Sequence, residues 1–164
     1  MRLLGEEGVV LTRAGDDEYV VYTEAEGVVI EKVSIRRAEG SYSGAVSVDE
    51  DSATVKDCDL RGTVIAEEGA KLLLQKCTVH DCTAPAVVVD GIAVIQDSIV
   101  QDSPGAGILV HEPFGGATIT GTTVRRCQTG LFVTTKATIA AAAPSRPAQR
   151  AASTPGRRRA GRAR

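Results

Sequence analysis

Aliphatic residues recur along this chain at a nearly constant spacing, and this repeat limits the choice of fold more than any other feature of the sequence. A first column, with intervals of 25, 19, 21, 24 and 20 residues, consists of Ile30, Val55, Leu74, Ile95, Ile119 and Ile139. Five positions after each of its first five members comes a second column, formed by Ile35, Leu60, Val79, Val100 and Val124. A period of about 22 residues predicts a solenoid, because one unit is too small to bury its own apolar face and must stack on its neighbours.

Each unit of the repeat is predicted to contain three short strands. Apolar and polar residues alternate through the first two columns, which is the period-two pattern of strands buried on one side. A third apolar segment follows in each unit, at residues 46–48, 64–66, 87–89, 108–110 and 131–133. These segments have neither the length nor the spacing of helices, and the chain lacks the dense leucine framework of leucine-rich repeats. The pattern therefore predicts an all-β fold, a right-handed parallel β-helix of about five coils.

Composition divides the chain into three segments: a lead-in at residues 1–8, the repeats at 9–139 and a tail at 140–164. The first 139 residues hold 12 Lys and Arg against 21 Asp and Glu, whereas the tail holds seven Arg and no acidic residue. The tail is rich in Ala, Pro and Arg and has no apolar period, so we expect it to be disordered. The sequence shows neither a secretion signal nor a membrane-spanning apolar run, which predicts a cytoplasmic protein, with the cytoskeleton and the nucleus as alternatives.

The four cysteines fall in two columns, Cys58 with Cys77 and Cys82 with Cys127. Neighbouring coils lie roughly 4.8 Å apart, so the geometry leaves a disulfide between Cys58 and Cys77 open. We expect buried reduced thiols instead, because Ser and Thr fill the same columns in other coils. Reduced thiols are typical of intracellular proteins.

Three segments carry a family resemblance: Ser52–Leu60, Gly69–Cys77 and Gly105–Val110. Together with the stretches at 9–13 and 28–33, they resemble the β-helix of the Shc-binding and nessun dorma cytokinesis proteins. F-box proteins with pectate-lyase-like repeats share the general pattern. The resemblance covers about residues 9–139. It implies a non-enzymatic scaffold that binds partner proteins at the mitotic spindle and midbody, with carbohydrate binding in one branch.

A polysaccharide-active enzyme is the main alternative, because many β-helices act on acidic polysaccharides. Such chemistry needs carboxylates and an acid–base group from neighbouring coils at the same strand position. The nearest approach to such a set is His80, Asp81 and Asp102, flanked by Arg61 or Arg125. These residues lie at predicted corners, where charges are expected simply because corners face water. The sequence therefore predicts a protein without catalytic activity, cofactor or metal.

Other charged positions in the sequence have simple structural explanations. Signs alternate in the column two positions after the first aliphatic column, at Lys32, Asp57, Lys76 and Asp97, which predicts a salt-bridge ladder. The run Asp49–Asp51 is interpreted as a solvated turn, with no second carboxylate expected opposite it. His111 begins a predicted loop and lacks the second histidine of a helical metal motif.

Arginines form an interrupted stripe that suits carboxylates and phosphates. With the nearby acid–base residues, the candidate binding set is Arg36, Arg61, His80, Asp81, Asp102, Arg125 and Arg126. We expect protein partners, with carbohydrate as an alternative ligand and no membrane contact. The Arg-rich tail offers weak, salt-sensitive and non-specific binding of nucleic acid.

The ends of the repeat generate a further expectation. The last predicted strand, at 137–139, runs directly into four alanines, and the first, at 9–11, follows eight residues without an amphipathic pattern. Solenoids protect their terminal coils, because open edges and cores invite association. We therefore expect the chain to associate end to end or to need a missing neighbour.

Overall fold

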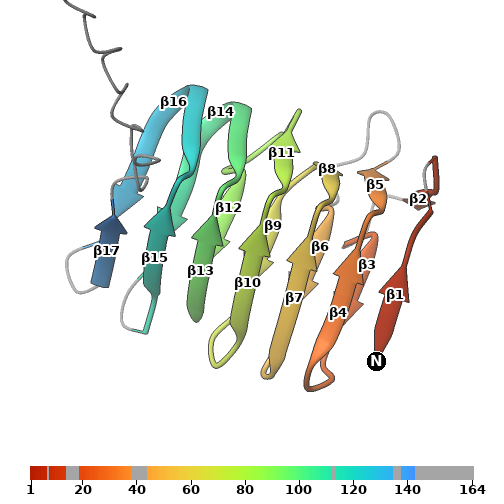
Figure 1. Ribbon diagram of the computed structural model, residues 1–164. Coiled ribbons are helices and arrows are strands. Elements are labelled where there is room, and N and C mark those ends of the chain that lie inside the picture. Colours follow the sequence, from red (N-terminus) through yellow and green to blue (C-terminus); the bar gives the residue numbers. More distant parts are fainter. Residues whose placement is uncertain (7, 14–18, 38–43, 112–113, 135–137, 143–164) are drawn as a thin grey trace, which may run out of the picture.

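The computed structural model describes residues 1–6, 8–13, 19–37, 44–111, 114–134 and 138–142. All regular elements in these ranges are β-strands, and they pair in parallel (Figure 1). The first face of the solenoid is a seven-stranded sheet of β1 (Arg2–Leu4), β4 (Val28–Glu31), β7 (Ser52–Lys56), β10 (Lys71–Gln75), β13 (Ile92–Gln96), β15 (Gly116–Thr120) and β17 (Thr138–Ala142).

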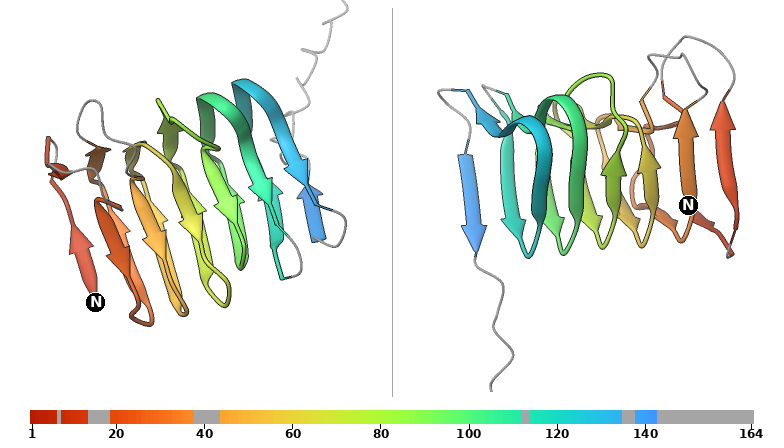
Figure 2. Two further views of the ribbon diagram at one scale, coloured as in Figure 1. Left: turned by 180° about the vertical axis from the view of Figure 1, so that it is seen from behind. Right: turned by 90° about the horizontal axis from the view of Figure 1, so that it is seen from above.

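The second and third faces are built by the strands that follow each first-face strand. The second face consists of β2 (Val10–Arg13), β5 (Ser34–Arg37), β8 (Asp59–Arg61), β11 (Thr78–His80) and the first halves of β14 (Ile99–Val110) and β16 (Thr123–Val133). The third face consists of β3 (Val21–Thr23), β6 (Val46–Val48), β9 (Val64–Ala66), β12 (Val87–Val89) and the second halves of β14 and β16. The two long strands bend from one face to the next, as the views in Figure 2 show.

The prediction of an all-β parallel solenoid is confirmed. Strands β4 to β16 form five coils, and β1 to β3 form one more before them. The first aliphatic column holds in register over these five coils, since Ile30 lies opposite Val55, and the pairing continues through Leu74 and Ile95. Their exposed fractions are 1% or less, so the column forms the centre of the core.

Two positions at the ends of the repeat differ from the sequence pattern. Ile139 lies opposite Ala117, and the true partner of Ile119 is Ala141. The shift is two residues, which keeps the same side chains facing inward. Within the predicted lead-in, Leu3 lies in β1 opposite Ile30 and starts the column one coil earlier. The tail was predicted to begin at residue 140, but residues 140–142 belong to β17. The rest of the predicted tail, residues 143–164, lies outside the described ranges.

The corner between the first and second faces is a turn with one residue in the left-handed region. Its φ angles are 59° at Lys32, 51° at Asp57, 53° at Lys76, 50° at Asp97 and 60° at Gly121. These are the residues that were expected to form a salt-bridge ladder. That prediction is wrong, because among the described residues no ion pair joins neighbouring members of this column. What the members share is the backbone conformation, which excludes β-branched side chains.

The next residue in each corner points inward, and in four of the five corners it carries a donor that bonds backbone groups, whereas the first, Val33, is apolar. Ser98 Oγ donates to the Gln96 carbonyl at 2.8 Å and accepts from the Cys77 backbone N–H at 3.2 Å. Thr122 repeats the arrangement one coil later and accepts from the Ser98 N–H at 3.4 Å. Cys58 occupies the same position with its Sγ 3.1 Å from the Lys56 carbonyl oxygen. Small side chains therefore fill this column, and all of them except Val33 carry a donor.

All four cysteines are free thiols. A hydrogen bond between Cys58 and Cys77 holds the pKa of Cys77 above its ordinary value and that of Cys58 below it. Burial raises the pKa of Cys82 to about 12. Cys77 and Cys82 therefore act as small core residues that remain protonated at neutral pH.

Replacing Leu74 with Ala is expected to destabilise the fold by about 2–5 kcal/mol, because it leaves a cavity at the centre of the stack. Leu74 is 0% exposed, whereas its neighbour Leu73 points outward from the same strand and is half-buried. Urea denaturation followed by circular dichroism measures the loss. Leu73→Ala is the matched control and should cost clearly less; equal losses for the two variants would contradict the assigned register.

Replacing Lys76 with Val is expected to destabilise the fold by about 1–2 kcal/mol, because a β-branched residue is strained at positive φ. Lys76→Asn should be tolerated, since Asn adopts this conformation more readily. Lys71→Val is the control: Lys71 is also exposed but lies in strand β10, where Val is favoured. The same denaturation measurement decides, and a harmless Lys76→Val would show that the corner does not need this backbone conformation.

Candidate functional site

The second face carries a charged cluster around His80. His80 Nε2 lies 2.9 Å from Asp59 Oδ1, and its Nδ1 lies 3.1 Å from Asp81 Oδ2. Arg61 Nε is 3.3 Å from the same Asp81 oxygen. Strands β8 and β11 pair in register and place these groups side by side. The sequence pattern did not point to Asp59, because this residue directly precedes Leu60 and lies outside the charged columns that suggested the other candidates.

The remaining candidate residues also have polar partners. Arg126 contacts both oxygens of Asp102, at 2.6 and 2.8 Å, while Arg125 Nε donates to Gln101 Oε1 at 2.8 Å. Arg36 lies 4.0 Å from Asp59. The hydrogen bond from Arg126 holds the pKa of Asp102 below its ordinary value. All seven predicted binding residues thus lie on the second face or at its corner, and each of them is paired within the protein.

The corner position itself explains part of this set. Asp81, Asp102 and Arg126 have φ angles of 50°, 56° and 52°, and Gly62 fills the same column with 129°. Asp and Gly are common where the backbone is left-handed. What the cluster offers chemically is one imidazole with a carboxylate at each nitrogen, an arrangement suited to proton transfer.

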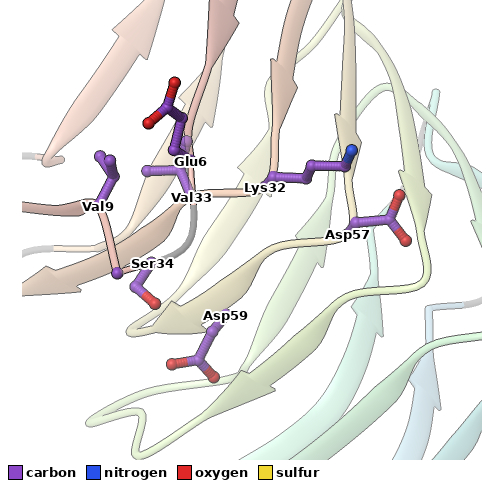
Figure 3. Close-up of a pocket in the computed structure, with 8 residues that line it drawn as sticks. Glu6, Val9, Lys32, Val33, Ser34, Asp57 and Asp59 are labelled. Atoms are coloured by element: carbon purple, nitrogen blue, oxygen red, sulfur yellow. The ribbon is translucent and has the colours of Figure 1, made fainter.

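A cavity of about 290 Å³ lies beside this cluster, at the corner between the first and second faces (Figure 3). Its polar walls come from Glu6, Lys32, Asp57 and Asp59, and Lys32 extends toward Asp57. Asp59 joins the cavity to the His80 cluster, since its carboxylate reaches both. Among the described residues, no group of three or more His, Cys, Asp or Glu has the arrangement of a metal site.

An acidic column follows the third face, which the sequence analysis did not detect. Asp49, Glu67 and Asp90 each come directly after a third-face strand, and the backbone N–H of each donates to the coil before it. The expectation that no carboxylate lies opposite Asp49 was therefore wrong. His111 continues the column, with its Nδ1 2.6 Å from Asp90 Oδ1. At the other end, Tyr22 Oη lies 2.6 Å from Asp49 Oδ2.

The pKa of Glu67 lies above its ordinary value. Burial is the largest cause, and the negative charges of Asp90 and Asp49 add to it, while a hydrogen bond from Ser47 acts in the opposite direction. Carboxylates on successive coils are held close by strand spacing, so their mutual repulsion is built into the fold. The corner is consequently a strongly acidic surface.

An apolar stripe runs along the outside of the third face, beside the acidic column. It consists of Ile65, Val88, Leu109 and Phe132, which lie opposite one another on successive coils. The first three are half-buried and Phe132 is 51% exposed. Each third-face strand has one outward side chain, so these four form a continuous row.

A second cavity, of about 310 Å³, lies where the third face turns into the first face of the next coil. It is lined by Glu68, Gly69, Ala70, Gly91, Ile92 and Phe114. Phe114 and Ile92 are 60% and 51% exposed. This cavity extends the apolar surface around the corner beyond the acidic column.

Three faces of parallel strands, wound from successive coils, define the chain as a parallel β-helix. The chain matches the family model of the right handed beta helix region over residues 18–142, and it belongs to that family. Neither the curated proteins nor the solved structures gave a significant match. The described residues include no helix that is long and apolar enough to cross a membrane. The family contains both enzymes and non-enzymes, so the fold alone leaves the function open.

Replacing Glu67 with Gln is expected to raise the melting temperature at pH 7. The folded-state pKa of Glu67 is raised, so its stabilising contribution is present below the unfolded pKa of about 4.3 and is lost as pH rises through the folded value. The advantage of the variant should therefore disappear below about pH 4. Thermal unfolding across this pH range measures it, with the exposed neighbour variant Glu68→Gln as control. A pH-independent difference would contradict the assignment.

Proposed function

We propose that this protein is a non-enzymatic interaction module that binds a partner protein along its third face. The apolar stripe is the observation that carries the proposal. An unbroken outward row of aliphatic and aromatic side chains is typical of docking surfaces. The acidic column lies along the same face, so the fitting partner presents apolar side chains together with Lys or Arg.

Two further observations support an interaction role. The seven candidate residues of the second face are paired with one another or with neighbours, which fits a structural charge network. The residues 9–139 resemble the β-helix of the Shc-binding and nessun dorma proteins, and that resemblance supports a scaffold role. A cytoplasmic location, with the cytoskeleton as the site of action, belongs to this proposal.

A second candidate function rests on His80. An imidazole between Asp59 and Asp81 supplies acid–base groups of the kind that polysaccharide-active enzymes need. Activity on polyuronates that is lost in Asp102→Ala or His80→Gln would support this function. If the protein is a non-enzymatic interaction module, a panel of acidic polysaccharides incubated with the full chain should give no new reducing ends and no unsaturated products.

Leu109→Glu is expected to abolish partner binding, because it places a carboxylate in the middle of the apolar stripe. A displayed random-peptide library selected on the full chain provides the probe. The enriched peptides should combine apolar residues with Lys or Arg and bind Leu109→Glu about tenfold or more weakly, since an unpaired buried charge costs well over 1.4 kcal/mol.

Thr78→Glu is the matched control for this experiment. Thr78 is also half-buried and points outward, but it lies on the second face in β11. Binding should survive there, and circular dichroism should show both variants folded. Peptides that bind Leu109→Glu and the native chain with equal affinity would contradict the proposed surface.

A further inference from the structure

The two ends of the solenoid carry strands with one neighbour each. At one end β1, β2 and β3 pair with β4, β5 and β6 respectively, and at the other β16 and β17 pair with β14 and β15. Figure 1 shows β1 and β17 at opposite ends of the stack. In the described part of the chain, both ends therefore present parallel edges with the same succession of three faces. Such edges are templates for further strand pairing.

The core is open at the β16 end. Leu131 and Val133 lie opposite Ile108 and Val110, which are 0% exposed, so they continue two inward columns. Yet Leu131 is 41% exposed and Val133 is 37% exposed. At the other end, Leu3 and Leu11 continue the two aliphatic columns and are partly buried. Each end thus offers core residues in the positions that another coil would cover.

The charges of the two ends are opposite. The described residues of the first coil carry Glu6, Glu24 and Glu26 against Arg2 and Arg13, and Arg2 is already paired with Glu31. The described residues of β15 to β17 carry Arg125 and Arg126 and no acidic residue. Contact between two identical ends brings like charges together, whereas contact between unlike ends brings opposite charges together.

We propose that copies of this chain stack head to tail, with β16 and β17 of one copy against β1, β2 and β3 of the next. All three faces then continue across the junction in the parallel sense, and the open core columns meet. The contact is heterologous, so each copy keeps one free end of each kind and the assembly grows without closing. This inference is independent of the proposed third-face binding, because it uses the ends of the solenoid and not its side.

Sedimentation velocity of the full 164-residue chain is the first test. In low salt of about 50 mM, the mean mass should rise steadily with protein concentration over the micromolar range, without stopping at a dimer. At about 1 M salt the Debye length falls to about 3 Å, and association should weaken roughly tenfold. A monodisperse monomer in low salt would overturn the proposal, and so would a closed dimer.

Two charge-reversed variants test the polarity of the contact. The head variant, Glu6→Lys with Glu26→Lys, changes two exposed residues of the first coil. The tail variant, Arg125→Glu with Leu131→Glu, changes two exposed residues of β16. Each variant alone should be a monomer, because like charges then meet at the junction.

An equal mixture of the two variants retains one native junction, between the unchanged tail of the head variant and the unchanged head of the tail variant. The mixture should therefore associate although neither component does alone. Glu50→Lys with Glu68→Lys, two exposed residues on the sides of the solenoid, is the matched control and should stack like the native chain. Failure of the mixture to associate, while both variants are folded by circular dichroism, would refute head-to-tail contact.

Deletion of residues 143–164 addresses the other candidate occupant of the β16 end, the chain's own Arg-rich segment. Stacking by the native chain that persists after the deletion supports a second copy as the occupant. A monomeric native chain that begins to associate only after the deletion would assign the end to that segment and overturn the proposal.

Discussion

The stacking of coils in parallel register is the constraint on which the whole structure depends. Leu74 is fully buried because Val55 and Ile95 lie opposite it on the neighbouring coils. Full burial of one such side chain contributes about 1.5–3 kcal/mol, whereas an isolated three-residue strand such as β9 has no stable pairing of its own. A slip of one residue would turn each inward column toward solvent, so the register is fixed wherever the columns are aliphatic. Burial in one coil therefore always depends on the next coil.

This register determines what the corners contain. A coil has to turn from the first face to the second within one or two residues, and it does so with a left-handed residue followed by a small inward residue, which is a donor in every such corner except that of Val33. The left-handed position tolerates Asp, Lys or Gly and rejects Val or Ile. Asp81 and Asp102 occupy the equivalent column at the next corner, which gives them a backbone reason to be there. A charged residue at a corner is therefore weak evidence for a catalytic or binding site. Whether charged residues of neighbouring coils form a functional cluster has to be judged from their contacts.

The sequence contains enough information to predict the fold and the inward columns, because five coils keep the same spacing between their first and second strands. Leu3 does not fit this pattern, because it precedes Leu11 by eight positions, whereas the two aliphatic columns are five positions apart in later coils. The acidic column escapes it for a related reason. Asp49, Glu67 and Asp90 follow the first aliphatic column by 19, 12 and 16 residues, although they are neighbours in space. Variable loops between the second and third strands conceal this alignment from any comparison based on fixed spacing, whereas backbone pairing restores it.

The second and third faces differ in how their charges are balanced. On the second face, arginines and carboxylates neutralise one another at short range. On the third face, carboxylates gather beside one another and border an apolar row, and burial together with the charges of Asp90 and Asp49 raises the pKa of Glu67. Such a surface gains most from a basic and apolar partner supplied from outside. Head-to-tail stacking would align the third faces of successive copies into one long surface on which the apolar stripe recurs once per copy. A partner with several binding segments would then engage it with an avidity that no single copy provides.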